Sequence, residues 1–95
     1  MIDPVTRSTG NVFADLGFDD EEAALLSVKS TLLSGLAEHV RTFGNQHEAA
    51  EALGIAQPRV SEIVNGRLSK FSTDLLVKLC HRAGLRVTAE VDLAA

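Results

Sequence analysis

The stretch Leu53–Gly66, LGIAQPRVSEIVNG, joins a glycine turn to a short amphipathic segment rich in amide, hydroxyl and guanidinium groups. A tight turn that feeds a short helix is the shape that lays side chains along a groove of DNA. With Val60 set inward and about 100° of rotation per residue, four side chains face outward and a fifth lies on the flank. These are Pro58, Ser61, Glu62 and Asn65 on the face, and Arg59 on the flank. The chemistry that this pattern favours is contact with base edges and phosphates.

The formal charge of the chain is −4, which as a total opposes binding to a polyanion, but the charge is unevenly distributed. Residues 56–87 hold six Lys and Arg against two carboxylates, a net charge of +4, whereas the remainder carries −8. Salt screens charges over roughly 8–10 Å at physiological ionic strength, so a phosphate responds to the local basic segment more than to the acidic remainder. Two ordinary solvated faces are the alternative interpretation.

The sequence contains no set of residues with the spacing of a catalytic or metal-binding motif. His39, His47 and His81 have no carboxylate or thiol at a metal-ligand spacing. Cys80 falls on an apolar stripe and is expected to be a buried packing residue. There is no glycine-rich phosphate loop, so the sequence predicts neither an enzyme nor a cofactor or metal site.

Length and composition predict one small domain of 95 residues, with a flexible arm over residues 1–11 and a single domain over 12–95. A single cysteine excludes an internal disulfide. No apolar run approaches the ~18 residues of a membrane span, and the N-terminus lacks the apolar core of a signal peptide. We therefore expect a cytoplasmic protein that does not associate with membranes.

Four helices are predicted to hold the functional face in place. A docking segment with Val12 and Phe18 precedes a long helix over residues 20–43, which Asp19 begins as in a capping box. A second helix covers about 46–53 and a third, 57–65, follows after a turn of about three residues. Ser72 is an N-cap for the fourth helix, which ends at Gly84.

The spacing across the turn meets the requirements of two helices that cross steeply. Ala50 is small where the second helix passes close, and Gly54 tolerates a positive φ. Val60 and Ile63 face inward and close a miniature core. Each feature alone is weak evidence, but together they occur in register over some twenty residues.

These residues resemble the Xre-type, lambda-repressor-like helix-turn-helix family, with the motif at about residues 46–66. The shared pattern runs from Gln46 through Ala49-Ala50, Leu53-Gly54-Ile55, Gln57 and Val60-Ser61 to Asn65-Gly66. The flanking segments are similar to a subgroup of HigA-like antitoxins, the partners of RelE-type ribonuclease toxins. Where relatives usually have Ser or Thr, this chain has Ala56, so its third helix should lack the usual N-cap oxygen.

The resemblance implies roles for the residues of this face. Gln57 is the best candidate for reading a base, because an amide pairs with adenine N6 and N7. Arg59 is a candidate for guanine or a phosphate, Asn65 for adenine or a phosphate, and Glu62 for cytosine N4 or for rejecting wrong partners. Phosphate contacts are expected from Gln46, Arg67 and Lys70, and Pro58 and Ser61 complete the face. Cap chemistry for Gln57 and Asn65 and an ordinary surface arginine for Arg59 are the alternatives.

The last residues change from a helical period to a period of two. Over 85–91 apolar and polar side chains alternate, which predicts a strand, and a lone strand is unstable in water. Pairing with a second copy, antiparallel about Thr88, would oppose Arg86 to Glu90 and Val87 to Ala89. The predicted homodimer interface is therefore Leu85, Arg86, Val87, Thr88, Ala89, Glu90 and Val91.

The predicted fold is thus mainly α, a lambda-repressor-like helix-turn-helix bundle with a long N-terminal helix and one C-terminal β-strand that pairs in a dimer. The predicted function is repression through a palindromic operator in double-stranded DNA. The protein would also be the antitoxin of a RelE-like toxin. The alternatives are a solitary Xre-type regulator without a toxin and a protein-interaction adaptor that does not bind DNA.

Overall fold

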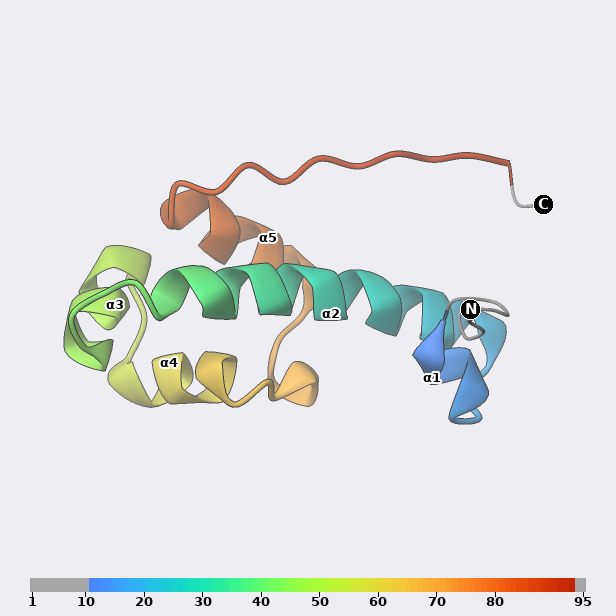
Figure 1. The fold of residues 1–95 in the computed structure, drawn as a ribbon, viewed down its shortest axis with the longest axis horizontal. Coiled ribbons are helices and arrows are strands. Elements are labelled where there is room, and N and C mark those ends of the chain that lie inside the picture. The colour runs from blue at the N-terminus through green and yellow to red at the C-terminus, as the bar shows by residue number, and fades with distance from the viewer. Residues whose placement is uncertain (1–10, 94–95) are drawn as a thin grey trace.

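The computed structural model describes residues 11–93, and in this part of the chain it contains five α-helices and one short 3₁₀ helix (Figure 1). Apart from Asn11, the predicted arm lies outside the described residues. In chain order the elements are α1 (Val12–Asp15), α2 (Asp20–Val40), α3 (Gln46–Leu53), α4 (Gln57–Val64), η1 (Leu68–Lys70) and α5 (Thr73–Arg82).

The longest element, α2, forms the axis on which the other helices pack. The Asp19 carboxylate caps it by accepting from the Glu22 N–H at 2.8 Å. The helix predicted over 20–43 is three residues shorter, because the Thr42 hydroxyl donates to the His39 carbonyl at 2.6 Å and the chain tightens there. Phe43 still packs against the core from the turn that follows.

The core lies where α2 meets α3, α4 and α5. Its largest fully buried side chains come from all four helices: Leu36, Leu53, Val60, Ile63, Leu76 and Leu79. No polar or charged residue is buried in the described part of the chain. Figure 1 shows α3 and α4 at one end of α2 and α1 at the other, with α5 on the opposite side of α2 from α4.

A short helix at the N-terminal side, α1, is fixed to the first turns of α2 by Asn11. The Asn11 carboxamide oxygen accepts from the Phe13 N–H at 2.9 Å, and its amide donates to the Ala23 carbonyl at 3.1 Å. Phe13 and Phe18 meet edge to face with ring centres 6.2 Å apart. One asparagine therefore both caps α1 and joins it to α2.

The C-terminal segment, residues 85–93, does not form the predicted β-strand. After α5, Gly84 takes a φ of +81° and the Leu85 N–H donates to the Cys80 carbonyl at 2.9 Å. The chain then runs extended alongside α2, back towards the end that holds α1 (Figure 1). Alternating residues give an extended backbone, but a strand also needs a hydrogen-bonded neighbour, and no described segment of this chain lies beside it as one.

Candidate nucleic-acid interface

The turn between α3 and α4 is built around Gly54. This residue adopts φ 68° and ψ 37°, the left-handed conformation that glycine accepts without a steric cost. The Ile55 N–H donates to the Ala50 carbonyl at 3.1 Å, which satisfies an end group of α3. Leu53, Val60 and Ile63 are fully buried beneath the turn, so the two helices are held by their own small core.

The first turn of α4 lacks a side-chain cap. Ala56 has the extended φ and ψ of an N-cap residue but no side-chain hydrogen bond, as the sequence predicted. Such a residue costs about 1 kcal/mol relative to Ser or Thr. Pro58 lies in the first helical turn, where its missing N–H leaves one fewer donor to satisfy.

The predicted DNA-contact residues divide into two groups by exposure. Three of them, Arg59, Ser61 and Glu62, are half-buried. The Asn65 side-chain amide donates to the Ser61 hydroxyl at 3.4 Å. The exposed members come from the start of α3, from α4 and its end, and from the loop that follows: Gln46, Gln57, Pro58, Asn65, Arg67 and Lys70.

Arg59 is held by its own chain on the flank of α4. Its Nη1 lies 2.9 Å from Glu62 Oε1 and donates to the Lys70 carbonyl at 3.1 Å. Its guanidinium carbon stacks 4.4 Å from the centre of the buried Phe71 ring. The side chain thus links α4 to η1 and to the residue after it.

The contact with Arg59 explains how Glu62 can lie on a surface that is expected to bind DNA. Glu62 is paired with Arg59, so the two charges offset one another at short range, with side-chain exposures of 33% for Arg59 and 30% for Glu62. Direct reading of guanine by Arg59 would require it to leave Glu62, Lys70 and Phe71. Its geometry instead positions the loop that carries Lys70.

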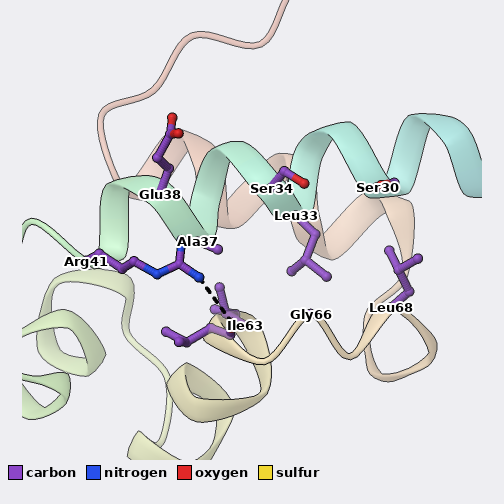
Figure 2. A pocket seen from close by; sticks show the side chains of 10 residues that line it. Ser30, Leu33, Ser34, Ala37, Glu38, Arg41, Ile63, Gly66 and Leu68 are labelled. Atoms are coloured by element: carbon purple, nitrogen blue, oxygen red, sulfur yellow. Dashed lines mark hydrogen bonds between the residues drawn. The ribbon is translucent and has the colours of Figure 1, made fainter.

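Two further arginines support the motif from outside it. Arg41 Nη2 donates to the Val64 carbonyl at 3.4 Å, near the end of α4, across an open groove between α2 and α4 (Figure 2). Arg82 Nη1 donates to the Leu53 carbonyl at 3.0 Å, at the end of α3. Each places a cation on the negative end of a helix of the motif.

Sequence reasoning missed the roles of Arg41 and Arg82. Both bonds join residues far apart in the chain, 23 and 29 positions, and no local pattern marks them. The only available signal is the type of residue, since arginine has the reach and the donors to cap a distant helix end.

The residues able to hold a metal or act as nucleophiles remain apart. Among residues 11–93 there is no group of three or more His, Cys, Asp or Glu that could bind a metal ion. Cys80 is buried, its Sγ lies 3.9 Å from the Leu32 carbonyl, and burial raises the pKa of its thiol. His47 and Glu51 lie one turn apart on the exposed side of α3, 3.6 Å from each other.

The geometry of α3, Gly54 and α4 defines a helix-turn-helix protein of the DNA-binding class. A family model described as a helix-turn-helix domain matches residues 12–92, so the chain belongs to that family. No curated protein matches the sequence significantly. Within the described residues, no helix is long and apolar enough to cross a membrane.

Proposed function

We propose that this DNA-binding regulator is a repressor that recognises a palindromic operator as a homodimer, with α4 as the recognition helix. The observation that carries the proposal is the solvent-exposed row of Gln57, Pro58 and Asn65 along α4, followed directly by exposed Arg67 and Lys70. Amides read base edges and cations bind phosphates, so the row combines both kinds of contact. A regulator of this kind acts in the cytoplasm, where its operator lies.

Binding to the DNA upstream of the protein's own gene tests this proposal. Gln57→Ala should weaken binding to that fragment by about 1–3 kcal/mol while affinity for unrelated DNA stays unchanged. Lys70→Ala should weaken binding to the upstream fragment and to unrelated DNA alike. It should also reduce the slope of log affinity against log salt concentration by about one. Lys78→Ala removes an equal charge from an exposed position of α5, which lies on the other side of α2, and is the matched control. A parent protein that does not bind the fragment would favour the adaptor interpretation, and unchanged affinity in the first two variants would contradict α4 as the recognition helix.

The homodimer is proposed because one recognition helix contacts too few bases for specific binding. Two helices about 34 Å apart would meet successive turns of the major groove. Residues 85–91 support this role, since beyond the Leu85 N–H their extended backbone pairs with no described segment of this chain. When two copies pair antiparallel about Thr88, Arg86 of each lies opposite Glu90 of the other.

An antitoxin role is the finer part of the proposal. Outside residues 56–87 the chain carries a net charge of −8, which would complement a basic ribonuclease of the RelE-like kind. Co-expression with the product of an adjacent small basic gene should give a stable complex and relieve any growth arrest. If no such gene lies beside this one, the protein is the solitary regulator.

A further inference from the structure

The side of α2 that faces α5 and the C-terminal segment is only partly covered. Leu32 is 8% exposed beneath α5, whereas Val28 and Leu25, one and two turns earlier, are 53% and 45% exposed. Spacings of three and four residues place these three side chains on one side of the helix. The apolar stripe therefore continues beyond the part of α2 that this chain covers.

The C-terminal segment presents a second uncovered apolar surface to the same space. Leu85 packs against the core, and Val87 lines a groove together with Leu32 and Gly35 of α2. Alternation in an extended chain places Val91 and Leu93 on the same side as these two residues. They are nevertheless 94% and 98% exposed, because the segment runs past α2 without packing on it (Figure 1).

Gly35 of α2 lies in the same groove between α2 and the C-terminal segment. Glycine inside a helix costs about 1 kcal/mol relative to alanine. No packing among residues 11–93 requires it here, because an added Cβ would meet nothing within 4 Å. It leaves the floor of the groove bare beside Leu32. A neighbouring backbone could approach α2 closely there.

We propose that the stripe of Leu25, Val28 and Gly35 is the second half of the dimer contact, and that it is covered by the same stripe of a second copy of this chain. This inference rests on the homodimer proposed above and extends it from the C-terminal segments to α2. Thr88, the centre of the antiparallel pairing, lines the groove with Thr31 and Gly35. A two-fold axis beside Thr88 therefore passes beside the middle of α2 and brings the two helices together.

The charge pattern favours a second copy over a partner of opposite charge. From Ala23 to Ala37, α2 carries a single charged residue, Lys29, so each helix brings only one cation, at the edge of the stripe, to a contact between two copies. In the paired segments Arg86 of each copy faces Glu90 of the other.

Sedimentation velocity across a wide range of protein concentration tests the inference with Val28→Asp. A carboxylate at the centre of a dry interface should raise the dimer dissociation constant about thirtyfold or more. Leu16→Asp is the matched control, because Leu16 is 69% exposed and directly follows α1. Since α1 lies on the other side of α2 from the C-terminal segment, this change should leave the dimer intact. Circular dichroism checks the fold, and Leu25→Asp provides a second variant at the same stripe.

The outcomes separate this inference from the dimer on which it rests. A parent protein that stays monomeric contradicts the dimer itself. If Val28→Asp and Leu25→Asp dimerise as tightly as the parent while Arg86→Glu does not, the C-terminal segments pair without α2 and the inference is overturned. If Leu16→Asp dissociates the dimer as strongly as Val28→Asp, the contact lies elsewhere and the inference is also overturned.

Discussion

Arg59 illustrates how a single side chain can support a binding surface from its edge. It contacts Glu62, the Lys70 carbonyl and the ring of Phe71. Two of these three partners belong to the loop after α4. Its first role is therefore to fix that loop, and any effect on DNA follows from where the loop holds Lys70.

Arg59→Ala is expected to lower the free energy of unfolding by about 1–2 kcal/mol, through loss of the stacking and of the hydrogen bond to the loop. Urea denaturation measures this change. Arg59→Lys keeps the charge but loses the planar group, so it should recover only part of the stability. An Ala variant as stable as the parent would show that the three contacts contribute nothing.

Glu62→Gln is expected to strengthen binding to DNA of any sequence. It removes a negative charge from the face of α4 and one of the three contacts that hold Arg59, so that Arg59 has a positive charge without an anionic partner. The slope of log affinity against log salt should therefore steepen by up to about 0.9. Fluorescence anisotropy over a salt series measures this slope, with Glu51→Gln on α3 as the control. An unchanged slope would mean that Arg59 stays bound to the loop.

At the scale of the elements, α4 is a helix that begins without a side-chain cap. Because Ala56 already has the backbone angles of an N-cap residue, Ala56→Ser should add one hydrogen bond without moving the chain. We expect a gain of about 1 kcal/mol in the free energy of unfolding. Ala52→Ser, at an exposed position inside α3, should instead cost a few tenths of a kcal/mol. Equal effects of the two changes would contradict a capping role.

The helices were largely predictable because their signals are local. Asp19 and Ser72 cap the helices that follow them, and Gly54 and Gly84 end helices with a positive φ, as their positions in the sequence indicated. The end of α2 was placed three residues too late, because apolar spacing continues through Phe43 although the backbone has already turned. Periodicity reports which side chains are buried, not which backbone is helical.

The candidate site was less predictable than the helices. The outward face of α4 follows from helical rotation, but the partners of Arg59 lie 3, 11 and 12 positions away and depend on how η1 folds back. The prediction of a C-terminal strand was wrong for a related reason. Alternation over 85–91 describes a chain able to pair, and a single copy offers no described segment that pairs with it.

At the scale of the whole molecule, the proposed dimer makes the charges of the C-terminal segment interdependent. Arg86→Glu should place Glu opposite Glu90 twice and shift the protein towards monomer, since like charges directly opposite destabilise a strand pair. The double variant Arg86→Glu with Glu90→Arg should restore the dimer. Sedimentation velocity measures both, and a dimer undisturbed by the single change would exclude pairing about Thr88.

The continuous helix α2 also has a consequence for how the sequence can diverge. It spans 21 residues, about 31 Å at 1.5 Å per residue, with α1 at one end and the α3–α4 motif at the other. Substitutions that far apart, with no shared partner, change stability additively. The residues proposed to read DNA can therefore be replaced over generations without altering the other end of the molecule, so the preferred DNA sequence would be free to change while the shared helix stays the same.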